Sequence, residues 1–169
     1  MTDFQIQRLL QERRLEDYAA VDSEVVGFLE KTVRAIADAQ AGISEEGAFL
    51  RAYEATFLCA TAAILNAGYR IRGSVEGHHH NLVLILRHLG VPKFTDLGNR
   101  WERLKRLRNQ SMYDGDARPR PEDVADMIAV AGELFTAVRQ EVEASRPSAR
   151  AILPTLPSPK RGGPSGRAV

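Results

Sequence analysis

The chain has 169 residues, of which 44% are hydrophobic and 27% charged, a composition typical of a globular domain and not of a fibrous or wholly disordered protein. Residues 1–144 hold 18 of the 23 Lys and Arg and all 22 Asp and Glu, whereas residues 145–169 hold the other five cations and no acid. The sequence therefore predicts an acidic body and a basic tail, which either aids solubility or associates with RNA, DNA or an acidic surface.

Two helices are predicted in the first 40 residues. A weaker one is expected around residues 6–15, and an amphipathic helix is expected over residues 22–40 with Asp22 or Ser23 as its N-cap. The apolar residues of the second helix recur at helical spacing and form one stripe, made of Val25, Val26, Leu29, Val33, Ile36 and Ala37.

The next helix is expected to begin after Ser44, a good N-cap, and to end before Gly68, because glycine readily adopts the left-handed backbone that follows a helix. Its apolar stripe runs from Phe49 to Ala67. Residues 69–77 are predicted to form a loop, and a short helix is expected over residues 78–89.

Two further helices are predicted in the second half of the chain. Gly90 and Pro92 are expected to end the short helix, and the fourth helix is expected to begin at Leu97 and to reach Tyr113. The last helix opens at Pro121 and shows regular periodicity to about residue 144.

No segment shows the period-two alternation of a strand, so we predict an all-α fold. Its architecture is an up-and-down helical bundle of four main helices plus an N-terminal helix, within residues 1–144. Residues 145–169 are rich in Pro, Gly and Arg and are predicted to be a disordered basic tail.

Cys59 is the only cysteine, so no internal disulfide forms and a reducing compartment is expected. The first residues lack the apolar segment of a secretion signal, and the apolar run over residues 57–65 is too short to span a bilayer. We expect a cytoplasmic protein with no membrane association.

The predicted helix ending at Tyr113 carries the most informative side chains. Arg108 follows Trp101 and Leu104 at i+7 and i+4, which places it on the stripe that faces the core. A buried guanidinium is costly unless it is paired. Arg108 is therefore expected either in a structural ion pair with an acidic residue or in a cleft or dimer groove.

A second, polar face of the same helix carries Arg106, Asn109, Gln110 and Tyr113 at i, i+3, i+4 and i+7. Guanidinium, amide and phenol groups suit phosphates and bases, because Arg grips phosphate with two hydrogen bonds and Tyr stacks or donates. Exposed helix faces are polar in any case, so the spacing alone does not distinguish an RNA-binding face from a solvated one.

Two short motifs resemble those of the HEPN family of helical-bundle proteins. Arg108-Asn109 lies late in the penultimate helix, four residues before a Tyr-Asp-Gly ending. Gly68-Tyr69-Arg70, followed by Gly77-His78-His79, a short helix and Leu89-Gly90, resembles bacterial HEPN proteins that accompany minimal nucleotidyltransferases. The resemblance spans residues 14–144. It implies an up-and-down bundle that commonly dimerises, with the motif helices of two subunits forming a cleft.

The active members of this family are metal-independent ribonucleases whose motif is an Arg, usually a polar residue, and then a His four to six residues after the Arg. Arg108 and Asn109 match the first two elements, but Tyr113 stands near the place of the His. The resemblance therefore implies a degenerate site in which Arg108 grips the scissile phosphate, Asn109 orients it and Tyr113 replaces the His. The general acid or base expected of such an enzyme is missing from the motif.

His78 and His79 lie at a helix N-terminus, which favours anion binding and lowers the pKa of an imidazole. His79 is therefore a candidate general base, and His78 is grouped with Arg70, Arg106 and Gln110 as phosphate-binding candidates. The alternative is that one histidine caps the helix, one packs and His80 is solvated.

The histidine run does not predict a metal site, because consecutive helical residues point in different directions and no Cys or acidic cluster completes a ligand set. The sequence likewise lacks a phosphate-binding loop or a dinucleotide fingerprint, so no cofactor is expected.

Two functions remain open. The first is a homodimeric HEPN-type protein directed at RNA, either a toxin-like ribonuclease or a weakened relative that only binds, in a toxin and antitoxin or defence setting. The second is a non-enzymatic scaffold whose acidic body binds a nucleotidyltransferase, an antitoxin or another protein. An exposed Arg108 in a cleft favours the first, and an Arg108 buried in an ion pair favours the second.

Overall fold

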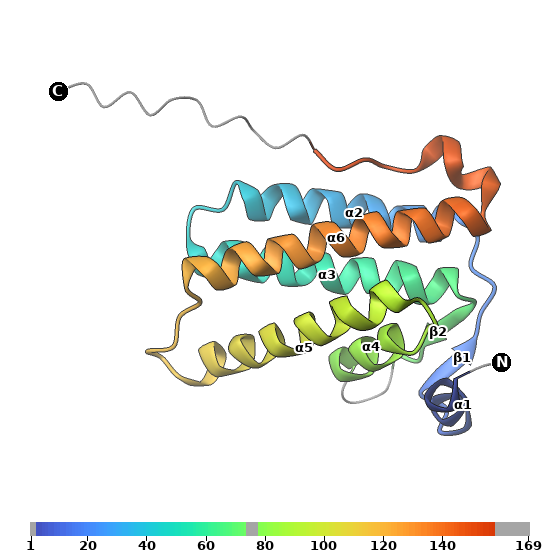
Figure 1. The fold of residues 1–169 in the computed structure, drawn as a ribbon, viewed down its shortest axis with the longest axis horizontal. Coiled ribbons are helices and arrows are strands. Elements are labelled where there is room, and N and C mark those ends of the chain that lie inside the picture. The colour runs from blue at the N-terminus through green and yellow to red at the C-terminus, as the bar shows by residue number, and fades with distance from the viewer. Residues whose placement is uncertain (1–2, 74–77, 158–169) are drawn as a thin grey trace.

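The computed structural model describes residues 3–73 and 78–157, and for residues 78, 79 and 111–113 it describes the backbone alone. Four long helices form the body of the molecule (Figure 1): α2 (Asp22–Gln40), α3 (Glu45–Asn66), α5 (Pro92–Tyr113) and α6 (Pro121–Ser145). Helices α2, α3 and α6 pack against one another, α5 packs on α6, and the short helix α4 (His78–Arg87) packs on α3 and α5. The structure thus confirms the prediction that the chain folds as a helical bundle.

Helix α2 has the predicted bounds, but its N-cap is neither Asp22 nor Ser23. The cap is Val21, whose extended backbone precedes the first turn, and its backbone N–H donates to the Glu24 carboxylate at 3.1 Å. A carboxylate three residues into the helix satisfies this otherwise unpaired donor. Asp22 is thereby left to make contacts with another part of the chain.

Helix α3 begins and ends as predicted. The Ser44 hydroxyl accepts a hydrogen bond from the backbone N–H of Gly47 at 3.1 Å, and Gly68 follows the helix with a φ of +90°. By length and composition α3 is the one candidate membrane span within the described residues, but 67% of that window is buried in the bundle. Its apolar side chains, such as Ala52 and Cys59, form the centre of the core, as expected in a soluble protein.

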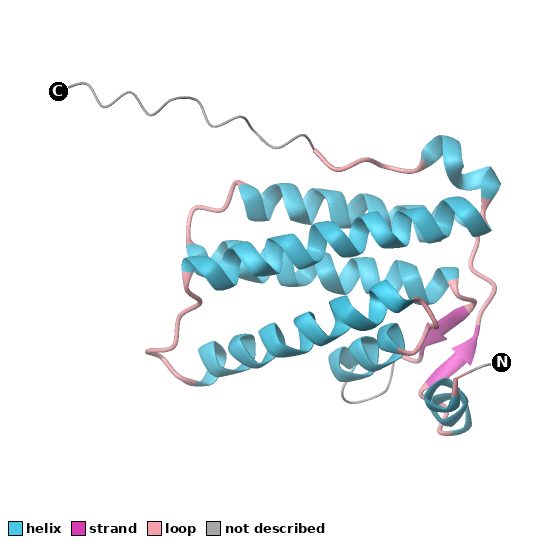
Figure 2. Ribbon diagram, in the orientation of Figure 1, coloured by secondary structure: helices cyan, strands magenta, loops and turns pink. Residues whose placement is uncertain are grey.

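A small antiparallel sheet of β1 (Leu15–Asp17) and β2 (Tyr69–Ile71) corrects the predictions that no segment forms a strand and that the loop begins at residue 69, while the fold as a whole stays helical (Figure 2). Three-residue strands are too short to show an alternating pattern, which explains the error. The N-terminal helix, α1 (Phe4–Gln11), accordingly ends before the predicted limit. Glu16 of β1 pairs with Arg70 of β2 at 2.6 Å and with Arg72 at 3.0 Å.

The junction of α4 and α5 also differs from the prediction. Helix α4 ends at Arg87, and Pro92 opens α5 five residues before the predicted start at Leu97. Proline suits the first position of a helix because that position needs no backbone N–H donor. Phe94, in the added turn, is buried, so the extra length contributes to the core.

The prediction of a disordered tail from residue 145 is wrong for residues 145–157. Helix α6 includes Ser145, and Pro147–Ile152 form the 3₁₀ helix η1, which packs on α2 and α6. Ala149 and Leu153 are buried, and the guanidinium of Arg139 donates to the backbone carbonyl of Pro154 at 3.0 Å. The segment orders because it has apolar residues to bury between its prolines. The remainder of the predicted tail, 158–169, lies outside the described residues.

Candidate functional site

Helix α5 presents three different faces. Leu97, Trp101 and Leu104 are fully buried, as their spacing predicts. Arg100 and Arg103 face α6, where they meet acidic side chains. The third face is exposed and carries Arg106, Asn109 and Gln110. These three polar side chains therefore face solvent, as their spacing predicts.

Arg108 is half-buried at the end of the apolar stripe of α5. Its guanidinium carbon lies 4.9 Å from the centroid of the Tyr53 ring, which belongs to α3. Tyr53 in turn meets Trp101 edge to face, with 5.8 Å between the ring centroids. A cation held over an aromatic ring is stabilised by about 0.5–2 kcal/mol. Arg108 thus packs against an aromatic pair.

The Tyr53 phenol is almost completely buried, and burial raises its pKa above the ordinary value. The nearby charge of Arg108 opposes this rise, while that of Glu102 adds to it. The phenol therefore stays neutral at physiological pH. Helices α3 and α5 each pack on α4 and α6. The contacts of Tyr53 with Trp101 and Arg108 also join α3 directly to α5.

Lys105 is a cation that the sequence analysis did not single out. Its side chain is only 13% exposed, and its ammonium nitrogen lies 3.8 Å from the Glu102 carboxylate. Lys105 precedes Arg108 by three residues, so the two side chains are neighbours on the surface of α5. The only indication in the sequence was that Lys105 and Arg108 are three residues apart. This spacing is too common to predict that a lysine is largely buried.

The histidines and the tyrosine of the predicted site are placed through their backbone only. His78 begins α4 and Tyr113 ends α5, whereas the side chains of His78, His79 and Tyr113 lie outside the described part of the chain. His80 is exposed. The roles predicted for His79 and Tyr113 therefore remain predictions.

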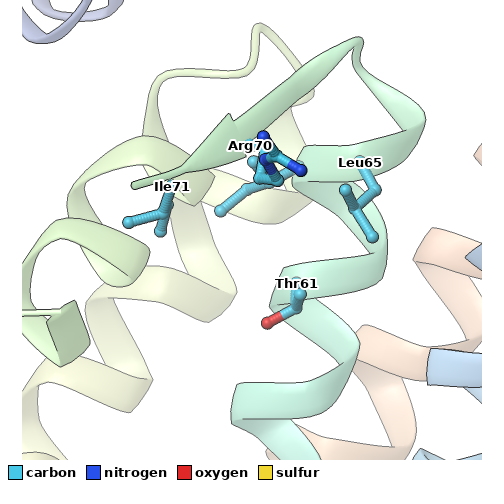
Figure 3. A pocket seen from close by; sticks show the side chains of 5 residues that line it. Thr61, Leu65, Arg70 and Ile71 are labelled. Atoms are coloured by element: carbon cyan, nitrogen blue, oxygen red, sulfur yellow. The ribbon is translucent and has the colours of Figure 1, made fainter. Parts of the chain in front are cut away.

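Arg70 lies apart from the other predicted phosphate-binding residues. It belongs to β2, which lies toward the opposite end of the bundle from the C-terminal end of α5 (Figure 1). Its guanidinium pairs with Glu16 and lies 4.3 Å from the centre of the Tyr18 ring. With Thr61 and Leu65 it borders a cavity of about 70 Å³ (Figure 3). The structure does not bring Arg70 together with Arg106.

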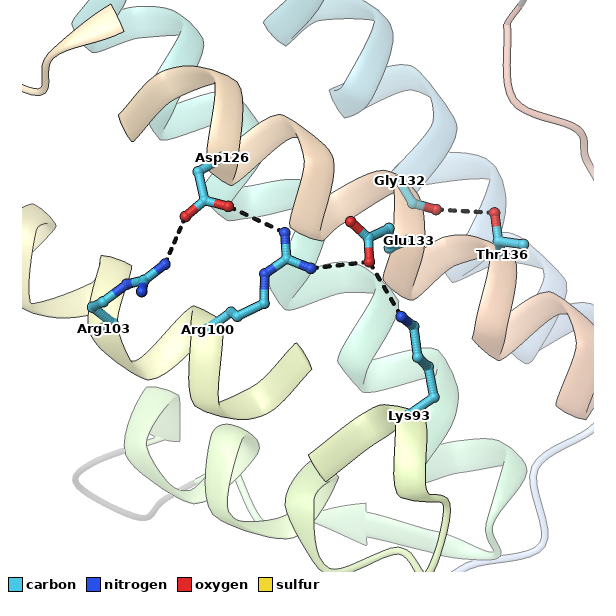
Figure 4. Close-up of polar contacts among 7 residues, drawn as sticks. All are labelled: Lys93, Arg100, Arg103, Asp126, Gly132, Glu133 and Thr136. Atoms are coloured by element: carbon cyan, nitrogen blue, oxygen red, sulfur yellow. Dashed lines mark hydrogen bonds and ion pairs between the residues drawn. The ribbon is translucent and has the colours of Figure 1, made fainter. Parts of the chain in front are cut away.

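Ion pairs join α5 to α6 along one side of the arginine-rich helix (Figure 4). Arg100 lies 3.1 Å from Asp126 and 2.9 Å from Glu133. Arg103 also pairs with Asp126, at 2.9 Å, and Lys93 pairs with Glu133, at 3.3 Å. Partial burial opposes ionisation of Glu133, but Arg100 and Lys93 outweigh it and hold the pKa of Glu133 below its ordinary value.

Among the side chains that the structure describes, no three of His, Cys, Asp or Glu are grouped so that they could hold a metal ion. No family model, curated protein or solved structure matches the chain. A function must therefore be inferred from the chemistry of these side chains and from the two short motifs.

Proposed function

We propose that the protein is a HEPN-type helical bundle that binds RNA through the C-terminal half of α5. The position of Arg108 supports this proposal, because the residue is half-buried, its guanidinium lies over the Tyr53 ring, and the exposed Asn109 follows it on α5. A guanidinium that is already partly desolvated and held by packing loses little freedom when it binds a phosphate. Arg108 is thus suited to bind a phosphate.

Two side chains on the exposed face of α5 extend the site around the helix. Asn109 offers an amide that orients the bound group, and Arg106 adds a second cation on the exposed face. The motif lacks the expected His, so this is an RNA-binding relative of toxin-like ribonucleases, acting in the cytoplasm as a homodimer. A nucleotidyltransferase or an antitoxin is the partner that the resemblance implies.

The direct test is binding of a fluorescently labelled single-stranded RNA, measured by anisotropy in EDTA. Arg108→Met keeps an apolar chain over Tyr53 and removes the charge, so it separates packing from phosphate binding. Loss of one charge-assisted contact of about 1.5–3 kcal/mol weakens binding roughly 10- to 100-fold. Arg34→Met on α2 is the matched control, because Arg34 is an exposed arginine on another helix.

Melting temperatures of the same variants decide between the two functions. If Arg108→Met binds RNA like the unmodified protein, the role assigned to Arg108 is wrong. If the unmodified protein binds no RNA and Arg108→Met also melts earlier, Arg108 is a structural residue. That result would support the scaffold function instead.

A further inference from the structure

Lys105 lies between Glu102 and Arg108 on α5, three residues from each. Side chains three positions apart on a helix differ by about 60° in direction, so Lys105 is the middle member of a group of three charged side chains. This group borders α3, because the guanidinium carbon of Arg108 lies 4.9 Å from the centre of the Tyr53 ring. Burial raises the pKa of the Tyr53 phenol, and the charge of Glu102 adds to that rise, so Glu102 borders the same ring.

The ammonium group of Lys105 is incompletely satisfied. The side chain is only 13% exposed, and its nitrogen lies 3.8 Å from the Glu102 carboxylate, which is beyond hydrogen-bond length. Arg100, by comparison, lies 2.9 Å from Glu133. Within the described part of the chain, the Lys105 ammonium makes no hydrogen bond. A largely buried cation requires opposite charge and hydrogen-bond acceptors, so Lys105 has donors for an additional anionic ligand.

The charge of the group matches one internal phosphate of a nucleic acid. One carboxylate, Glu102, and two cations, Lys105 and Arg108, give the group a net charge of +1. Each phosphodiester of a nucleic-acid strand carries one negative charge, so a bound phosphodiester neutralises the group. A terminal phosphate carries nearly two negative charges at neutral pH and would leave one of them uncompensated.

We infer that Lys105 is a second phosphate ligand beside Arg108, and that the two side chains together bind one internal phosphodiester of a single-stranded RNA. This inference rests on the RNA-binding function proposed above. When the phosphate binds, the Lys105 ammonium turns from Glu102 and donates to a phosphate oxygen. The exchange breaks no hydrogen bond and forms a charge-assisted one. Glu102 is a positioning residue, which holds the lysine near the site and competes with the phosphate for it.

The test measures the Kd of the full chain for a labelled single-stranded RNA with and without a 5′ phosphate. Lys105→Met keeps the apolar part of the side chain and removes the ammonium, so it should weaken binding of both RNAs roughly 10- to 100-fold, the effect of one charge-assisted hydrogen bond. Lys105→Arg keeps the charge and should bind more tightly than Lys105→Met. Arg103→Met removes a cation from the side of α5 that faces α6, and it should leave Kd unchanged.

Glu102→Gln acts in the opposite direction and gives a result that a purely structural role of Lys105 does not predict. It removes the competing carboxylate, so it should tighten RNA binding whatever its effect on the melting temperature. Unchanged binding in Lys105→Met, or in Glu102→Gln should Lys105→Met fail to fold, overturns the inference. If Arg108→Met still weakens binding, the proposed function then stands. Tighter binding of the RNA with a 5′ phosphate would exclude an internal phosphodiester as the ligand. If the unmodified protein binds neither RNA, both proposals fail.

Discussion

Arg146 and Asp22 form an ion pair of 2.9 Å although 124 positions separate them in the chain. The same guanidinium donates to the backbone carbonyl of Ala20 at 2.8 Å and to the side-chain oxygen of Asn66 at 2.9 Å. The Ser148 hydroxyl donates to the second carboxylate oxygen of Asp22 at 2.5 Å. These contacts fasten the segment after α6 to the start of α2 and the end of α3.

We predict that removing residues 146–169 lowers the melting temperature by several degrees, whereas removing residues 158–169 leaves it unchanged. Only the first deletion removes Arg146 and the buried Ala149 and Leu153. Hydrogen bonds to charged groups contribute about 1.5–3 kcal/mol, and 1 kcal/mol corresponds to roughly 2–4 °C in a chain of this length. Calorimetry of the two deletions beside the full chain checks this. Equal melting temperatures for all three would mean that the fastening contributes nothing.

The contribution of Asp22 to stability should depend on pH. Ser148 and Arg146 donate to its carboxylate and hold the pKa of Asp22 below its ordinary value. A lowered pKa in the folded state gives stability that is present above the unfolded pKa, about 4, and is lost as the pH falls through the folded value. Asp22→Asn should therefore melt earlier than the unmodified protein at pH 7.

That difference should shrink as the pH falls from about 4 toward 3, where the carboxyl of the unmodified protein becomes neutral as well. Thermal unfolding of both proteins across pH 3 to 7 measures it. Asp96→Asn is the control, since Asp96 is exposed on α5. A difference that stays constant down to pH 3 would show that geometry, not charge, makes Asp22 important.

The sequence predicted the long helices well because their apolar stripes are strongly periodic. The bounds of α2 were predicted, and so were the caps of α3 at Ser44 and Gly68. Pro92 was misinterpreted because proline both follows one helix and opens another. The strand pairing of Glu16 with Arg70 depends on where the bundle brings the two segments, which no local pattern encodes.

The candidate site was predictable only within α5 itself. Helical spacing placed Arg108 on the core-facing stripe and Arg106 on the exposed face, as the structure has them. The support of Arg108 by Tyr53 was not predictable, because Tyr53 belongs to a different helix, and the sequence does not show which side chains of two helices meet. The burial of Lys105 likewise depends on the elements that pack around α5 and not on the sequence of α5.

We predict that the protein is a homodimer at tens of micromolar. Arg108 lies half-buried at the end of an otherwise buried stripe, and the family resemblance implies that the motif helices of two subunits meet at this position. Light scattering coupled to gel filtration should give twice the 18.7 kDa of one chain. A mass of one chain across that concentration range would exclude a groove shared by two copies and would restrict the proposed RNA site to a single subunit.

The last prediction is that the protein binds RNA but cleaves it slowly or not at all in EDTA. A positioned acid or base typically contributes about 10²–10⁴ in rate, and Tyr113 stands near where the motif would have its His. Tyr113→His should therefore raise the cleavage rate of a labelled RNA, provided that Arg108 is intact. The double variant with Arg108→Met is the control and should remain inactive. Rapid metal-independent cleavage by the unmodified protein that disappears in His79→Ala would contradict the prediction, and it would assign the general base to the start of α4.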